Sequence, residues 1–281
     1  SERIGKKDLK SIIQHDDIDD DLRNALWNAV NIFYFDQVKK NFLPSSSNSR
    51  SINIFLRIIW ADYFKLRIDE QPQNFSEIKS FIKNYFFNTE WYEVYDFVEF
   101  LPRTYKGNYS KSINADYITF CNLKLEKELS GYRFINGQIA GISSPQSVKA
   151  IENAINLTDS FKPVNAHLKR ALELFSDRQK PDYRNSIKES ISAVESYCAI
   201  LTNNTKTTLG QALKIIEKDH KIHEALKKSF SNLYGYTSNA DGIRHALLEE
   251  EKLRQEDAQF MLVSCSAFID YLFQKQSKKI E

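Results

Sequence analysis

The chain is poor in the two residues that most often interrupt helices, with 8 glycines and 6 prolines among 281 residues. Both destabilise a helix interior, and turn-rich β architectures use more of them. Apolar residues instead recur three and four positions apart along most of the sequence, which is typical of amphipathic helices. The sequence therefore predicts a mainly α protein with short connections.

Composition narrows the class of protein further. Hydrophobic residues make up 42% and charged residues 27%, as in soluble globular proteins, and the length suits one large domain or two ordinary ones. The net charge of +2 is too small to make the whole surface bind nucleic acid, so a polyanion site would be a local patch. No apolar run is long enough to span a membrane, and the first residues are charged rather than signal-like. We expect a cytoplasmic protein that does not contact a membrane.

Cysteine and histidine usage argues against metal and cofactor chemistry. Cys121, Cys198 and Cys265 lie far apart within helical patterns, which predicts buried thiols in a reducing compartment. His220 and His223 have no cysteine or third ligand nearby, so a metal site there is not expected. The sequence contains no glycine-rich phosphate loop. We therefore expect no metal and no cofactor.

Three segments differ in pattern and predict three parts. Residues 1–112 predict an N-terminal helical domain, 113–160 a helix–hairpin–helix connector, and 161–281 a C-terminal helical bundle. Within the connector, Asn136 and Gly137 separate two short apolar runs, as in a two-residue hairpin turn. The hairpin is either a winged-helix element that contacts nucleic acid or a spacer between domains, and we favour the spacer.

Local signals predict several boundaries inside these parts. Residues 17–43 read as a helix, and the polar stretch 44–49 reads as a loop. A helix is expected near 114–129, with Gly131 as its C-terminal cap. Two helices beginning near 76 and 89 are rich in aromatic residues, which either stack on nucleic-acid bases or pack a small core. We favour the core.

The pattern most suggestive of chemistry is Arg244 followed by His245, just after a Ser/Asn/Asp/Gly break where a helix should start. Arginine binds phosphate oxygens as a planar fork, and histidine transfers protons near neutral pH. The pair is either an RNA-binding or RNA-cleaving site or two ordinary residues of a helix surface. Arg184, Glu189 and Glu195 on the preceding long helix are supporting candidates. Glu195 either orients His245 or pairs with Arg244, or it forms a solvated or structural salt bridge.

Two regions of the chain resemble known families. The start, SERIGKK followed by IQHDDIDDDLRNALWNAV, resembles the AbiJ-type N-terminal domain of bacterial abortive-infection and other phage-defence proteins. The second half resembles a HEPN-like C-terminal domain in the runs PDYRNSIKESISAVESYCAIL, LYGYTSNADGIRHALLEEE and EDAQFMLVSCSAFIDYL. These two resemblances together cover most of the chain.

The HEPN resemblance implies a helical bundle that commonly dimerises and that often cleaves RNA without a metal. By analogy, the catalytic residues are Arg244 and His245, with Arg184 and Glu195 in support and a homodimer formed through the C-terminal domain. Catalytic HEPN proteins place several residues between the Arg and the His, whereas here the two are adjacent. The alternative is therefore a catalytically silent dimer that binds RNA or a protein. In the nuclease hypothesis the N-terminal domain would sense a protein or phage-derived trigger.

Overall fold

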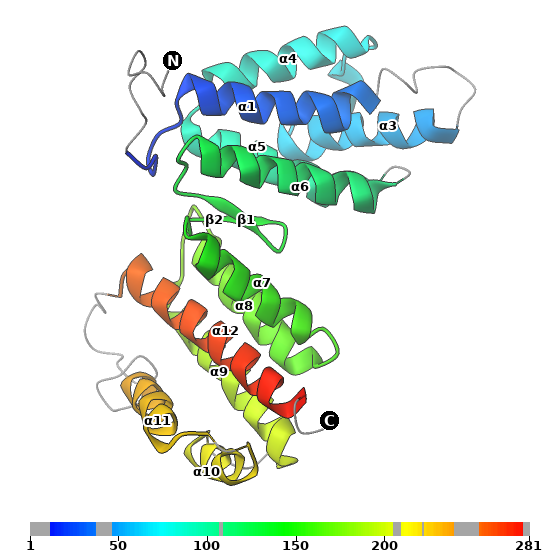
Figure 1. Cartoon of the computed structure of the whole chain (residues 1–281). Coiled ribbons are helices and arrows are strands. Elements are labelled where there is room, and N and C mark those ends of the chain that lie inside the picture. The colour runs from blue at the N-terminus through cyan, green and yellow to red at the C-terminus, as the bar shows by residue number, and fades with distance from the viewer. Residues whose placement is uncertain are drawn as a thin grey trace, which may run out of the picture. The chain divides into compact units, whose positions relative to one another are not determined.

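The computed structural model describes residues 12–37, 47–106, 109–204, 209–220, 222–238 and 253–277. The chain divides into two compact units, residues 1–143 and residues 144–281 (Figure 1). Helices dominate both units, which confirms the predicted mainly α fold. The division lies inside the segment 113–160 that was expected to form a connector, so the first helix and the hairpin of that segment belong to unit 1 and its second helix to unit 2.

Unit 1 is a group of helices with one small hairpin. Its longer helices are α1 (Asp20–Val30), α3 (Ser47–Ile58), α4 (Phe75–Asn88), α5 (Trp91–Thr104) and α6 (Ser110–Lys127). Two π-helical turns, η2 (Asn31–Phe35) and η3 (Ile59–Tyr63), continue α1 and α3, and η4 (Ile68–Glu70) is a 3₁₀ turn. The helix at Ser47 corrects the predicted loop over 44–49, of which residues 44–46 lie outside the described part.

The start of helix α1 is fixed by a capping residue and by acidic residues in its first turn. The side chain of Asp19 accepts a hydrogen bond from the backbone N–H of Leu22, and Asp20 and Asp21 place negative charge at the positive end of the helix. The apolar face then packs on α5 and α6, and Trp27 meets the ring of Phe86 on α4. Figure 1 shows α1 between α4 and α6.

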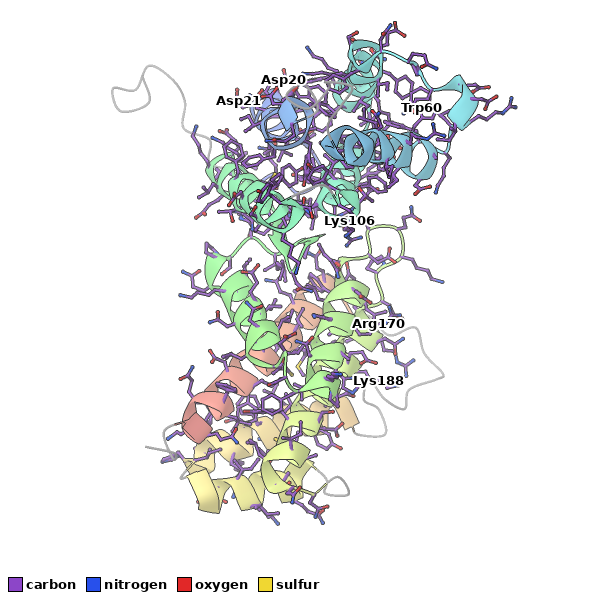
Figure 2. All side chains as sticks on the ribbon, turned by 90° about the vertical axis from the view of Figure 1, so that its right-hand side faces the viewer. Asp20, Asp21, Trp60, Lys106, Arg170 and Lys188 are labelled. Atoms are coloured by element: carbon purple, nitrogen blue, oxygen red, sulfur yellow. The ribbon has the colours of Figure 1, made fainter. Side chains whose placement is uncertain are left out.

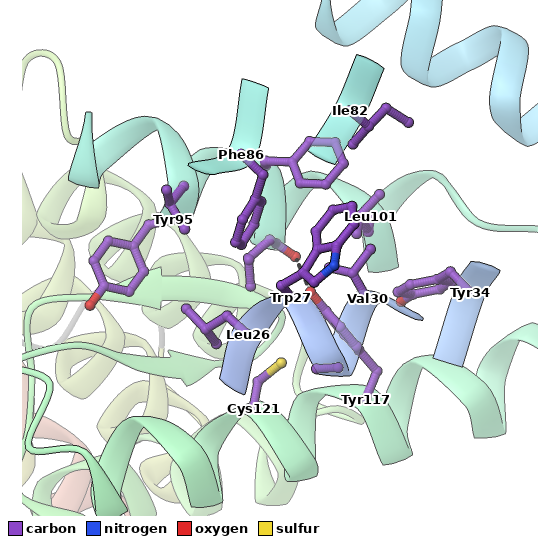
Figure 3. Packing of buried hydrophobic residues seen from close by; sticks show 14 of the residues in the cluster. Leu26, Trp27, Val30, Tyr34, Ile82, Phe86, Tyr95, Leu101, Tyr117 and Cys121 are labelled. Carbon is purple, nitrogen blue, oxygen red and sulfur yellow. Dashed lines mark hydrogen bonds between the residues drawn. The ribbon is translucent and has the colours of Figure 1, made fainter. Parts of the chain in front are cut away.

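Aromatic side chains fill the core of unit 1, as the sequence analysis favoured. Phe86, Tyr95 and Phe97 are fully buried, and Figure 3 shows the ring of Phe86 beside Trp27. Lys79 and Lys83 lie over the rings of Phe35 and Phe87 within the same unit, at 5.7 and 5.9 Å from the ring centres. The aromatic helices therefore build a core, and these two lysines cover its rings.

The hairpin is held against the helices of unit 1 by side chains of α5 and α6. Strands β1 (Arg133–Ile135) and β2 (Gln138–Ala140) pair antiparallel across Asn136 and Gly137. Both turn residues have positive φ, 49° and 78°, as the predicted two-residue turn requires. The carboxylate of Glu99 accepts a hydrogen bond of 2.5 Å from the N–H of Ile139.

Gly131 has a different role from the expected helix cap. The residue with left-handed backbone after α6 is Leu129, at φ 56°, and Gly131 has no positive φ. Gly131 instead donates its N–H to the carbonyl of Gln14 at 2.7 Å, and a Cβ at this position would lie 2.4 Å from Nδ1 of His15. The chain thus needs glycine here because the segment before α1 passes directly over it.

Unit 2 is a helical bundle. Its described helices are α7 (Pro145–Leu157), α8 (Lys162–Ser176), α9 (Tyr183–Thr202), α10 (Leu209–His220), α11 (Glu224–Ser238) and α12 (Gln255–Ser277). Ser144 caps α7 by accepting a hydrogen bond from the N–H of Ser147, and Pro145 occupies the favourable first position.

Helices α9 and α12 form the centre of unit 2. Helix α9 packs on α8, α10 and α12, and α12 also packs on α7 and α8. An apolar stripe of α9 is buried at Ile187, Ile191, Val194 and Cys198. The buried apolar residues of α12 are Ala258, Met261, Leu262, Cys265, Phe268, Ile269 and Leu272. A single large core thus accounts for most of the apolar residues of this unit.

Two absences hold for the described residues. None of the helices described is both long and apolar enough to cross a membrane. The same residues contain no group of three or more His, Cys, Asp or Glu side chains placed to share a metal ion.

Candidate functional site

Arg244 and His245 lie outside the described residues, in the segment 239–252 between α11 and α12. The described chain resumes at Leu253 and enters α12 at Gln255.

The two supporting residues on α9 lie far apart along the helix. Arg184 is in the first turn and Glu195 follows eleven residues later, which places their Cα atoms about 16 Å apart along the axis. Their angular positions differ by only about 20°. Both side chains are half-buried and make contacts within the structure. Both residues therefore lie on the same side of α9, but they are too far apart along the helix to belong to one catalytic centre.

The start of α12 lies at the Arg184 end of α9. Burial raises the pKa of Tyr183, and the charge of Glu256 in the first turn of α12 adds to that rise. At the other end, the hydroxyl of Tyr197 donates to Gln276 at 3.2 Å. Helices α9 and α12 therefore run parallel, and the segment carrying Arg244 and His245 rejoins the described chain near Arg184 rather than near Glu195.

The sulfur atoms of unit 2 are unsuited to nucleophilic chemistry. Burial raises the pKa of Cys198 and of Cys265 to about 12, and the neighbouring charge of Glu195 adds to the rise at Cys198. Both groups stay protonated thiols at neutral pH, which agrees with the prediction of buried structural cysteines.

A histidine–carboxylate pair joins α8 and α9. Nδ1 of His167 lies 2.6 Å from Oε2 of Glu189, with the two side chains 36% and 25% exposed. Ser186 on α9 donates to the carbonyl of Ala171 on α8, so the two helices are antiparallel and closely packed next to the pair. A carboxylate that holds one imidazole nitrogen fixes the ring and directs the other nitrogen away. Among described residues this is the arrangement in unit 2 most suited to proton transfer or anion binding.

Cationic side chains flank this pair on the surface. Arg170, three residues after His167, is exposed and lies 3.1 Å from Glu173. Lys188 immediately precedes Glu189 and is also exposed. Figure 2 labels Arg170 and Lys188 on one side of unit 2, extending from the helices that carry the pair.

The sequence signal for His167 was weak. Glu189 was weighed as a supporting carboxylate, but His167 stands alone in an ordinary amphipathic helix with no motif around it. The two are 22 residues apart and meet only through the antiparallel register of α8 and α9. A helical-wheel comparison of the two helices could have placed both on facing edges, without fixing that register.

Unit 1 contains a separate cavity of about 490 Å³ between α3, η4 and α4. Arg57, Asp69 and Gln73 contribute polar groups to its lining, and Leu56 and Ile78 contribute apolar surface. Its size is within the range of small-molecule sites. None of the residues that the sequence singled out as catalytic lies in it.

The first part of the chain matches a known protein family. Residues 1–157, more than half of the chain, match the family described as AbiJ N-terminal domain 4. The chain belongs to this AbiJ family. The comparisons found no matching curated protein and no matching solved structure. The AbiJ match confirms the N-terminal resemblance drawn from the sequence, and it indicates a role in abortive-infection phage defence.

The AbiJ match extends past the boundary between the two units. It covers all of unit 1 and continues through α7, whose described contacts include α8 and α12 of unit 2. Helix α7 is thus an AbiJ-family element that packs in the core of the second unit. The remaining residues, 158–281, carry Arg184, Glu195, Arg244 and His245.

Proposed function

We propose that this AbiJ-family protein is a cytoplasmic phage-defence effector whose second unit is a metal-independent, HEPN-type endoribonuclease. The observation that carries the proposal is the joining of an AbiJ domain to a helical bundle whose α11–α12 connection contains Arg244 and His245. The resemblance of unit 2 to HEPN domains supports the same reading.

Cleavage of RNA without a metal needs three groups. A base takes the proton of the 2′-hydroxyl as that oxygen attacks phosphorus, a cation stabilises the charged phosphorane, and an acid protonates the departing 5′-oxygen. His245 is assigned as the base or acid and Arg244 as the cation. Arg184 is the supporting residue favoured by the parallel course of α9 and α12, because α12 begins at its end of α9.

One Arg-His pair is too small a set for all three roles. Adjacent residues of a helix point about 100° apart, so Arg244 and His245 would not both face one phosphate squarely. A homodimer formed through unit 2 would supply the missing acid from a second copy, as the two-fold symmetry of a dimer permits. In this proposal the AbiJ domain responds to a protein or phage-derived trigger.

The alternative is a catalytically silent dimer that binds RNA or a protein. The adjacency of Arg244 and His245, which departs from the spaced arrangement of catalytic HEPN proteins, favours it. The nuclease and the silent binding module differ in one property: only the nuclease cleaves RNA when the protein acts.

Phage infection of cells that carry the gene tests the proposal. Wild-type protein is expected to reduce phage yield with fragmentation of cellular RNA, and His245→Ala is expected to abolish both while protein levels stay unchanged. Protection without RNA fragmentation, retained in His245→Ala, would support the silent binding module instead. Lys214→Ala on the exposed side of α10 is a matched surface control.

A further inference from the structure

The ring of His167 is held so that one nitrogen remains available. Glu189 occupies Nδ1 at 2.6 Å, and among described residues no other hydrogen bond to this ring is found. Because Glu189 contacts Nδ1, the other ring nitrogen, Nε2, is the one left for a ligand. The side chain is 36% exposed, so a ligand from solvent can reach it.

Two cationic side chains lie on the same two helices as the His167–Glu189 pair. Arg170 is one turn from His167 on α8, and its surface ion pair with Glu173, with side chains 58% and 48% exposed, stabilises little and can be exchanged for another anion. Lys188, which precedes Glu189 on α9, is exposed on the side of unit 2 that also carries Arg170 (Figure 2). Guanidinium, ammonium and imidazole groups together are typical donors to phosphate oxygens.

Two neighbouring positions on α9 are polar. Asn185 is exposed and Ser192 half-buried, one turn before and one turn after Glu189. Amide and hydroxyl groups of this kind contact phosphate and sugar without reading base identity. The absence of a large aromatic residue at these two positions argues for recognition of a backbone rather than of stacked bases.

We propose that the surface made by His167, Arg170 and Lys188 on α8 and α9 binds a backbone phosphate of single-stranded RNA. Glu189 is the positioning residue that orients the His167 ring. The inference rests on the proposed function, which provides RNA as the polyanion. It assigns binding of the RNA strand to residues outside the Arg244–His245 pair.

The test is fluorescence anisotropy with a short labelled single-stranded RNA in EDTA, using full-length protein in a His245→Ala background so that cleavage does not interfere. Adding His167→Ala is expected to weaken binding about tenfold, the effect of losing one charge-assisted hydrogen bond. Adding Arg170→Ala and Lys188→Ala is expected to reduce the slope of log affinity against log salt by about 1 to 2. Lys214→Ala on α10 should leave the affinity unchanged.

Glu189→Gln separates a binding role from a merely structural one. The amide retains an acceptor for Nδ1 and removes a negative charge, so RNA affinity should be kept or increased. Equal affinity of the parent and the His167→Ala protein would overturn the inference, as would failure of the parent to bind RNA at micromolar concentration. Wild-type cleavage is measured separately. If the protein binds RNA through His167 but the wild-type protein never cleaves RNA, the nuclease assignment is wrong and the RNA-binding surface is still supported.

Discussion

The carboxylate of Glu99 on α5 accepts a 2.5 Å hydrogen bond from the backbone N–H of Ile139 on β2 and lies 2.7 Å from Arg103. This contact pins the second strand of a hairpin that is too short to be stable alone. Glu99 is 8% exposed, so the N–H that it satisfies is shielded from water.

Replacing Glu99 with alanine should therefore destabilise the protein by about 1 to 3 kcal/mol, the effect of leaving a buried donor without a partner. Glu99→Gln should lose less, because its amide oxygen still accepts from Ile139. Urea unfolding followed by circular dichroism measures both, with the exposed Glu126→Ala on α6 as control. Equal stability of Glu99→Ala and wild type would show that the hairpin is held by other contacts.

The segment containing Gln14 and His15 lies so close to Gly131 that a larger residue should not fit there. A Cβ there would lie 2.4 Å from Nδ1 of His15 and 3.1 Å from the carbonyl oxygen of Gln14. The exposed His15 ring can move, but the Gln14 backbone is itself hydrogen-bonded to Leu129 and Gly131. Gly131→Ala should cost about 1 to 3 kcal/mol, as overpacking does. Gly210→Ala on α10, where nothing lies within 4 Å, should not destabilise, and comparable losses in both variants would contradict this account.

Buried thiol and phenol groups make stability fall at high pH. Burial raises the pKa of Cys198, Cys265 and Tyr197 to about 12, above the ordinary values of 9.0 for the thiol and 10.0 for the phenol. The unfolded state releases these protons first, so the free energy of unfolding is unaffected below about pH 9 and declines as pH rises toward 12. Urea unfolding between pH 8 and about 11 measures this slope. A Cys198→Ala, Cys265→Ala protein should show a shallower decline, and an unchanged slope would count against burial of the two thiols.

The sequence predicted those parts of the fold that local chemistry determines. Asn136 and Gly137 require a turn with positive φ at both residues, and the structure has it. Apolar residues three and four positions apart predicted helices correctly, because helical periodicity is a property of each segment by itself.

The features that sequence reasoning missed depend on contacts between distant segments. By sequence alone Gly131 resembles a helix cap, because its contact with Gln14 becomes apparent only in the structure. Helices α1 and α3 also continue as π-helical turns that place Tyr34 and Ile59 in the core. His167 and Glu189 likewise meet only through the register of two helices.

The candidate site was predictable in residue type more than in geometry. Arg184 and Glu195 were both expected to support Arg244 and His245, yet eleven residues of helix separate them. A catalytic role for the Arg-His pair stays a prediction, since both residues lie outside the described chain.

Incubation of purified protein with total RNA and tRNA in EDTA tests the central claim most directly. Wild-type protein is expected to cleave and to leave 2′,3′-cyclic phosphate ends, because the 2′-oxygen is the nucleophile. His245→Ala and Arg244→Ala should each lose that activity at unchanged melting temperature, and Lys214→Ala should retain it. Cleavage that survives in His245→Ala would contradict the assignment of the Arg-His pair as the catalytic centre.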